Sequence, residues 1–258
     1  MITRLKNCVP VFFLLLWCGC ALLDMQAPKR EDKNPLAEAQ KAFDDKAYVD
    51  AINLFQDYIQ KHPKSKDYTI ALQRLGESFE GLLDLEYKRR MDNGAAEPLA
   101  RKEFLAKFGH YNCWQDGPRG LQYNKTHFKT ILEKYPDSPI ADEAAYRMIV
   151  WEQDYKGRPE GLARELQALE EIFKKYPTTS LRPEILYEMA HRCHILYEMY
   201  SFSPVPDVRN QQKAQEYKEK ARYLYQLSLS SPEHSKYSEK AWKDMDLLQK
   251  GVRIYQLN

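Results

Sequence analysis

Two histidines and a cysteine, residue types that can bind a metal ion, lie close together in one predicted helix. They are His191, Cys193 and His194, and the two histidines, three positions apart, share a helix face. With His110 and Cys113 they would offer zinc the imidazole and thiolate ligands that it prefers. The spacing matches no zinc-finger pattern, and neither an H-E-x-x-H helix nor a haem-attachment motif is present. We therefore expect half-buried structural histidines, no bound metal and no cofactor.

The two cysteines that follow the first twenty residues are Cys113 and Cys193. If the chain is exported they lie in an oxidising compartment, where two thiols can form a disulfide. Pairing requires that their Cα atoms come within reach, and sequence alone does not fix that distance. Because Cys193 lies in the middle of a predicted helix, we expect it to pack as a small apolar residue. We predict two reduced thiols, with a disulfide as the alternative.

No other pattern of catalytic residues is present in the sequence. The chain has no nucleophile elbow, no phosphate-binding loop and no dinucleotide fingerprint. Its carboxylates, such as Glu170-Glu171 and Asp142-Glu143, fall on the outer faces of predicted helices, where we expect water to solvate them. The sequence therefore predicts no enzyme and no small-molecule substrate. The alternative, an enzyme built on the two histidines and Cys193, would carry bound metal after purification.

The first nineteen residues have the organisation of an export signal. Arg4 and Lys6 precede an apolar core at residues 9–17, which is shorter than the ~20 residues of a transmembrane helix. Gly19 and Cys20 follow directly, and this order resembles the signal of bacterial lipoproteins. In that family the cysteine carries a diacylglycerol on its thiol and an acyl chain on its amine, so the resemblance implies Cys20 as a lipid anchor. An ordinary cleaved signal or an uncleaved anchor is the alternative.

The residues after Cys20 suggest where such a lipoprotein would be sorted. Ala21, rather than an aspartate, follows the cysteine, and in the lipoprotein family this implies the outer membrane. Residues 20–33 are polar and include a mixed run of charges, which is typical of a solvated tether. We therefore divide the chain into a signal at 1–19, a tether at 20–33 and a folded domain at 34–258.

Charge excludes two classes of partner. The chain has 39 Lys+Arg and 37 Asp+Glu, and loss of Arg4 and Lys6 with the signal would make the two numbers equal. A neutral chain has no general electrostatic attraction to nucleic acid and no basic surface for anionic lipid. Attachment to a membrane would then come from the acyl chains on Cys20.

An internal repeat organises the rest of the chain. When the sequence is aligned on four prolines, each is preceded by apolar residues at offsets of eight, five and four, except that Ser228 takes the last position before the fourth proline; these offsets lie on one face of an α-helix. The prolines are Pro63, Pro136, Pro177 and Pro232, and the residues eight positions before them are Phe55, Phe128, Leu169 and Leu224. Because proline cannot continue a helix, each copy predicts an amphipathic helix with a stop. After the first three prolines, a Ser or Thr two positions on is a suitable N-cap for the next helix.

A second helix follows each proline turn in the predicted unit. Apolar residues recur eight positions after the first three prolines, and aromatic residues recur ten positions after the last three. These residues are Ala71, Ala144 and Ile185 in the first series, and Tyr146, Tyr187 and Trp242 in the second. A helical hairpin with one apolar face must bury that face on the next hairpin, as in an α-solenoid. The low glycine content and the lack of alternating apolar runs also predict an all-α protein.

The first unit, with helices expected at residues 35–45 and 48–61, resembles a tetratricopeptide repeat. Ala51, Phe55 and Pro63 have the spacing of the small, aromatic and proline positions of that family. The resemblance implies an α-solenoid of tetratricopeptide-like helical hairpins. The regular spacing is lost after Pro63, where we expect a helix at 83–91, a break at 92–94 and a helix at 97–108.

Two irregular loops, at residues 109–120 and 201–210, interrupt the predicted hairpins. Loops on a rigid helical scaffold often carry binding groups, and large aromatic residues anchor many interfaces. Tyr111, Trp114, Tyr200 and Phe202 lie at these loops and are our candidate partner-binding residues. A structural loop would bury these rings, whereas a binding loop would leave them partly exposed.

The whole chain resembles the BamD-type (ComL/YfiO) outer-membrane lipoproteins in its lipidation signal, its tether and its repeats ending in KYPDSP and KYPTTS. The resemblance implies a protein anchored to the outer membrane, facing the periplasm, that acts as a scaffold in the machine inserting β-barrel proteins. Its partners would be envelope proteins. The alternative is another tetratricopeptide-like envelope lipoprotein, acting in the Tol-Pal system, polysaccharide export or envelope maintenance.

Overall fold

The structure, a computed structural model, describes residues 34–117, 120–152, 155–230 and 236–255. The predicted signal, the tether with Cys20, and Pro232 lie outside the described residues. The chain from Pro35 onward forms one compact unit by itself. None of the helices in the described ranges is long and apolar enough to cross a membrane.

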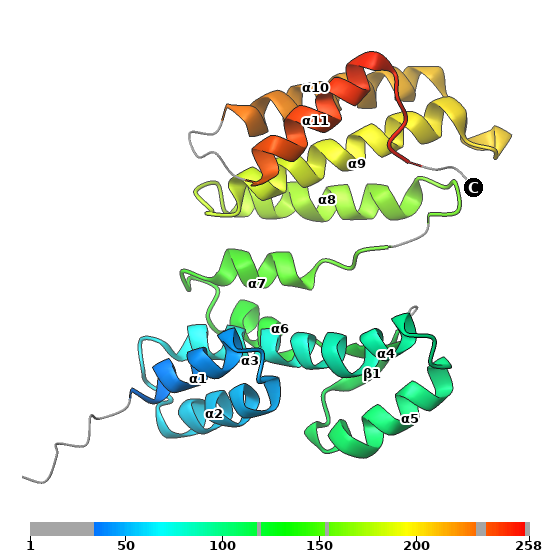
Figure 1. Cartoon of the computed structure of the whole chain (residues 1–258). Helices are drawn as coiled ribbons and strands as arrows, with labels where there is room; N and C mark the ends of the chain where they lie inside the picture. Colours follow the sequence, from blue (N-terminus) through cyan, green and yellow to red (C-terminus); the bar gives the residue numbers. More distant parts are fainter. Residues whose placement is uncertain (1–33, 118–119, 153–154, 231–235, 256–258) are drawn as a thin grey trace, which may run out of the picture. The chain divides into compact units, whose positions relative to one another are not determined.

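The described chain is mostly helical, as the sequence predicts (Figure 1). The helices are α1 (Pro35–Asp44), α2 (Tyr48–Lys61), α3 (Tyr68–Leu83), α4 (Arg89–Asp92), α5 (Glu97–Phe108), α6 (Thr126–Lys134), α7 (Ala141–Met148), α8 (Glu160–Lys175), α9 (Arg182–Phe202), α10 (Gln211–Leu229) and α11 (Lys236–Lys250). The predicted first unit therefore corresponds to α1 and α2, which pack against each other.

Three proline turns, after α2, α6 and α8, have the same backbone hydrogen bonds. In each turn the residue before the proline donates its N–H to the carbonyl four residues earlier, at 2.8 Å. The hydroxyl two residues after the proline accepts the N–H two positions further on, at 3.0 to 3.5 Å. The hydroxyl residues are Ser65, Ser138 and Thr179. The helices begin three residues later, so each predicted N-cap residue forms the turn leading into its helix.

The apolar positions of the repeat are buried. Phe55, Phe128 and Leu169 are 0% exposed, and so are the three residues eight positions after the prolines: Ala71, Ala144 and Ile185. The aromatic series behaves differently, because Tyr187 is buried and Tyr146 half-buried while Trp242 is 64% exposed. This position faces the next unit of the repeat, and no helix follows α11 in the described part of the chain.

The segment between α3 and α6 departs from the hairpin pattern. A π-helical turn (Asp84–Lys88) and α4 continue α3, and α5 has the predicted bounds. The loop expected at 109–120 instead contains an antiparallel hairpin of β1 (Trp114–Gly117) and β2 (Gly120–Tyr123). This corrects the expectation of a chain without strands. The hairpin is held by packing, since Trp114 and Tyr123 both lie against Phe79 of α3.

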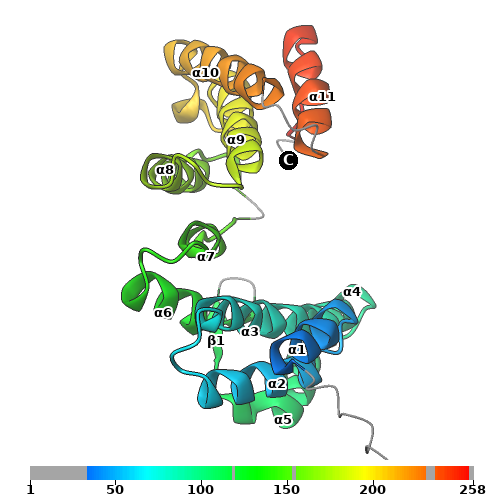
Figure 2. The same ribbon diagram turned by 90° about the vertical axis from the view of Figure 1, so that its left-hand side faces the viewer.

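The C-terminal part of the described chain is organised around α9. This helix packs against α8, α10 and α11 (Figure 2). It includes Ser201 and Phe202, so the loop predicted at 201–210 begins later than expected. A 3-10 turn (Pro206–Val208) follows, and Asn210 caps α10 by accepting the N–H of Lys213 at 3.0 Å.

Candidate functional site

The repeat places a row of side chains along α3, α7, α9 and α11, the helices that follow the four repeat prolines. Gln73, ten residues after Pro63, donates a hydrogen bond to Glu143, seven residues after Pro136. At the same offsets in the next unit, the Tyr146 hydroxyl donates to Glu184 at 3.0 Å. Tyr187 continues the series and donates to Asp244 of α11 at 3.0 Å. We call this row the inter-unit strip; its members are Gln73, Glu143, Tyr146, Glu184, Tyr187 and Asp244.

A second contact repeats at the proline turns. The Ser138 hydroxyl donates to Thr69 Oγ1 at 3.0 Å, and the Thr179 hydroxyl donates to Asp142 Oδ2 at 2.6 Å. Each acceptor lies four residues after the hydroxyl residue of the preceding turn. Two contacts therefore recur at fixed positions, and the units following Pro63, Pro136 and Pro177 rest on one another in the same way.

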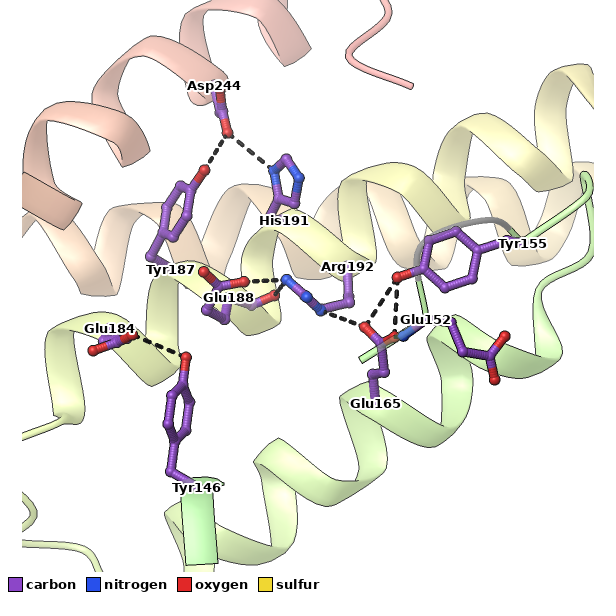
Figure 3. Close-up of polar contacts among 10 residues, drawn as sticks. All are labelled: Tyr146, Glu152, Tyr155, Glu165, Glu184, Tyr187, Glu188, His191, Arg192 and Asp244. Carbon is purple, nitrogen blue, oxygen red and sulfur yellow. Dashed lines mark hydrogen bonds and ion pairs between the residues drawn. The ribbon is translucent and has the colours of Figure 1, made fainter. Parts of the chain in front are cut away.

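At the C-terminal end of the strip, a histidine beside it bonds to the carboxylate of Asp244 (Figure 3). His191 Nδ1 lies 3.1 Å from Asp244 Oδ2, the oxygen that also accepts the Tyr187 hydroxyl. Burial raises the pKa of Asp244, but the hydrogen bonds from His191 and Tyr187 outweigh it and hold this pKa below its usual range. Asp244 is therefore an ionised acceptor that joins α9 to α11.

A buried ion pair lies beside the strip, between α8 and α9. Glu165, 2% exposed, accepts hydrogen bonds from Arg192 Nε at 2.9 Å, from the Tyr155 hydroxyl at 3.0 Å and from the backbone N–H of Glu152 at 2.5 Å (Figure 3). Arg192 also pairs with Glu188. Because these groups satisfy one another, the cluster fixes the loop between α7 and α8.

The residues considered for a metal site have other partners. His194 is buried, with Nε2 3.4 Å from Glu198 and Nδ1 3.4 Å from the Tyr225 hydroxyl. Burial lowers the pKa of His194 to about 4 and raises the pKa of Cys113 and Cys193 to about 12, so all three are neutral at pH 7. Within the described ranges, no three His, Cys, Asp or Glu side chains are grouped as metal ligands would be.

The two cysteines are free thiols in separate buried clusters. Cys113 belongs to the cluster formed mainly by α1, α2, α3, α5, α6 and the β-hairpin. Cys193 belongs to the cluster of α8 to α11 and is 0% exposed. The structure thus agrees with two reduced thiols and a protected Cys193, and neither thiol has the depressed pKa of a reactive cysteine.

Two of the four candidate partner-binding aromatics pack against Phe79 of α3. The ring centroids of Trp114 and Tyr111 lie 5.7 and 5.2 Å from that of Phe79, and both rings are only half-exposed. Trp114 Nε1 also donates to the carbonyl of Phe108 at 2.7 Å. Tyr111 and Trp114 therefore contribute to holding the β-hairpin on α3 and α5, while both rings stay partly exposed.

The other two candidates lie at the C-terminal end of α9. Tyr200 is half-buried and stacks on Tyr217 of α10 at 5.6 Å. Phe202 is 45% exposed; its ring meets the edge of Tyr197 at 6.2 Å, and the guanidinium of Arg253 lies 5.5 Å from its ring centroid. Of the four rings, Phe202 therefore has the exposure that we expect of a binding residue.

Tyr146 and Tyr187 of the strip stand out in the sequence as repeat tyrosines, but the carboxylates on these helices do not stand out as hydrogen-bond acceptors. Asp142-Glu143 was expected on a solvated face, yet Asp142 accepts from Thr179 and Glu143 accepts from Gln73. The available signal was spacing, because Glu143 and Glu184 both lie seven residues after a repeat proline.

Comparison of the chain with models of protein families and with curated proteins finds no match in either case. The resemblance to tetratricopeptide repeats and BamD-type lipoproteins therefore depends on the residues of this chain alone.

Proposed function

We propose that this protein is a lipid-anchored scaffold of tetratricopeptide-like hairpins that binds proteins of the bacterial envelope. The observation that carries the proposal is the recurrence of the same two contacts between successive units, at the proline turns and along the inter-unit strip. Units that rest on their neighbours by a repeated contact form an α-solenoid, and α-solenoids bind peptides and proteins on extended surfaces.

The chemistry of the strip suits recognition. Its tyrosines are held on rigid helices, and tyrosine is enriched among the residues that dominate binding energy. Exposed charges lie beside it, including Arg147, whose side chain is 46% exposed, and Lys240, which lies over the rings of Tyr187 and Tyr237. Because Tyr187 is buried, a partner crossing α7, α9 and α11 would meet the half-buried ring of Tyr146 and these two cations.

The anchor and the partner are part of the same proposal. Lipidation of Cys20 would attach the scaffold to the outer membrane, facing the periplasm. The repeats ending in KYPDSP and KYPTTS support a place in the machine that assembles outer-membrane β-barrel proteins. A second candidate is a role in the Tol-Pal system, polysaccharide export or envelope maintenance. It is favoured by residues 84–123, where a π-helical turn and a β-hairpin interrupt the regular pairs.

Copurification tests the proposal. The native lipoprotein is isolated from detergent-solubilised envelopes as wild type, as Arg147→Glu beside the strip, and as Lys174→Glu on the exposed side of α8. We expect β-barrel assembly proteins with wild type and with Lys174→Glu, and fewer with Arg147→Glu. Proteins of the Tol-Pal system or of an exporter would favour the second candidate. Recovery no greater than with an unrelated lipoprotein would contradict the scaffold.

A further inference from the structure

After α11 the chain reverses and lies on α9. Gly251 has a φ of +69°, the left-handed conformation in which many helices end, and the N–H of Val252 donates to the Leu247 carbonyl at 2.9 Å. Figure 1 shows the following segment, in red, leaving α11 and running down beside α9. We call residues 253–255 of this segment the tail.

The backbone of the tail is bound by one carboxylate of α9. The N–H groups of Ile254 and Tyr255 donate to the two oxygens of Glu198, at 2.7 and 2.9 Å. Glu198 is 1% exposed, and its remaining close polar neighbour is His194 at 3.4 Å. Burying a carboxylate without hydrogen-bond donors costs free energy, and the two N–H groups of the tail are the donors that offset this cost for Glu198.

Two aromatic rings of the folded domain receive the side chains of the tail. The Arg253 guanidinium lies over Phe202, and the Tyr255 ring lies 6.0 Å from that of Tyr155, at an interplanar angle of 59°. The tail thus presents a cation, an apolar residue and an aromatic residue in succession. Glu198, Phe202 and Tyr155 recognise its backbone, its cation and its aromatic ring respectively.

We propose that Tyr155, Glu198 and Phe202 form a peptide-binding site, and that the tail occupies it in place of a partner segment. The partner would be a segment of an envelope protein that carries arginine, an apolar residue and an aromatic residue in succession and has the same bend, in which two consecutive N–H groups face one carboxylate. This inference rests on the proposed scaffold function, and it names the chemistry of one partner.

The tail is held in a way that permits exchange. Arg253 is exposed and Ile254 and Tyr255 are only half-buried, whereas Glu198 and Tyr155, two of the groups that receive the tail, are held by the fold. Glu198 lies inside α9, four residues before its last residue, and the Tyr155 hydroxyl is bonded to Glu165. The two hydrogen bonds to Glu198 use only the main chain, so they select the bend of a segment and not its sequence, and the flanking rings then select its side chains.

A labelled peptide tests the proposal on the full-length protein. The probe is Gly-Val-Arg-Ile-Tyr, residues 251–255, amidated and carrying a dye, and its binding is measured by fluorescence anisotropy. In wild type the attached tail competes at an effective concentration on the order of millimolar. The double variant Arg253→Ala/Tyr255→Ala should therefore bind the peptide at least tenfold more tightly than wild type.

Two controls show whether the peptide enters the proposed site. Adding Phe202→Ala to the double variant should abolish the gain, and because Phe202 is 45% exposed this change should not unfold the protein. A peptide with alanine in place of arginine and tyrosine should bind neither protein. The proposal would be overturned if the peptide bound wild type and double variant with equal affinity, or bound neither. It would also be overturned if the double variant melted at a lower temperature than wild type and bound no peptide. A third contradicting result would be that the protein forms dimers and the peptide dissociates them, because the site would then bind the tail of a second copy and not a partner protein.

The envelope copurification separates this inference from the scaffold itself. If the scaffold function is wrong, neither wild type nor the double variant recovers envelope proteins. If only the peptide site is wrong, both recover the same proteins in the same amounts. If the peptide site is right, at least one envelope protein copurifies in greater amount with the double variant than with wild type, and adding the peptide releases that protein.

Discussion

At the scale of single residues, burial separates two arginines that both pair with glutamate. Arg192 pairs with Glu165, and their side chains are 12% and 1% exposed, whereas Arg164, paired with Glu152, is 68% exposed. Arg192→Ala leaves a buried carboxylate without its cation and should lower the free energy of unfolding by about 3–5 kcal/mol. Arg164→Ala should cost about 1 kcal/mol or less. Urea denaturation measures both, and similar losses would show that the Arg192 pair is not buried in solution.

A histidine in the aromatic cluster should make the protein sensitive to acid. His127 stacks on Phe79 at 5.5 Å and is bonded to the Tyr123 hydroxyl, and burial lowers its pKa to about 4. The folded protein therefore binds this proton more weakly than the unfolded chain, in which histidine titrates near about 6.5. The contribution of neutral His127 to stability is complete above about pH 6.5 and is lost as the pH falls toward 4.

The variant His127→Asn isolates this effect, because the asparagine oxygen can accept the Tyr123 hydroxyl without titrating. Between pH 6.5 and 4, the unfolding free energy of wild type should fall more steeply than that of the variant, by up to about 1.4 kcal/mol per pH unit. Chemical denaturation at a series of pH values gives both curves. Parallel curves would mean that His127 titrates normally in the folded protein.

At the scale of the elements, the register of the repeat makes a paired prediction. Phe128→Ala and Leu169→Ala remove side chains that are 0% exposed, and each should cost about 2–5 kcal/mol of unfolding free energy. The neighbouring changes Lys129→Ala and Glu170→Ala truncate side chains on the solvent side of α6 and α8 and should cost little. Equal losses in thermal or urea denaturation would show that the repeat is out of register.

The elements that sequence predicts well have local causes. The bounds of α2 and α5, and the ends of α6 and α8, follow from a turn proline or from helix-starting residues, which act within a few positions. The β-hairpin has no such signal, because its four-residue strands are stabilised by Phe79, far away in sequence. The strip cannot be predicted from sequence for the same reason, since Glu184 meets its hydrogen-bond donor, Tyr146, only when the units stack.

The candidate aromatics show the limit of composition as a guide. Trp114 and Phe202 both lie at irregular segments, and sequence treats them alike. The structure places Trp114 against Phe79 and Phe104, while Phe202 projects from the end of α9. Which ring is exposed depends on how far a helix extends and on what packs over the loop, and both are tertiary properties.

At the scale of the whole molecule, the anchor can be tested apart from the folded domain. Cys20→Ser should remove labelled palmitate from the protein, because no thiol is then available for the diacylglycerol. The matched control is Cys18→Ser, which lies in the same predicted signal and should keep the label. Metabolic labelling followed by immunoprecipitation measures both. Label on Cys20→Ser at the wild-type level would remove the lipoprotein assignment.

Site-specific photo-crosslinking in the native envelope shows whether a protein partner binds along the helices that follow the repeat prolines. A photoreactive residue is placed at Arg147 on α7 and at Lys240 on α11, both beside the strip, and at Gln167 on α8 and Gln215 on α10, both exposed on helices that precede a repeat proline. We expect both strip positions to crosslink to the same envelope protein, and the positions on α8 and α10 to crosslink weakly or not at all. Crosslinks confined to α8 and α10, or absent from all four positions, would contradict binding at the strip.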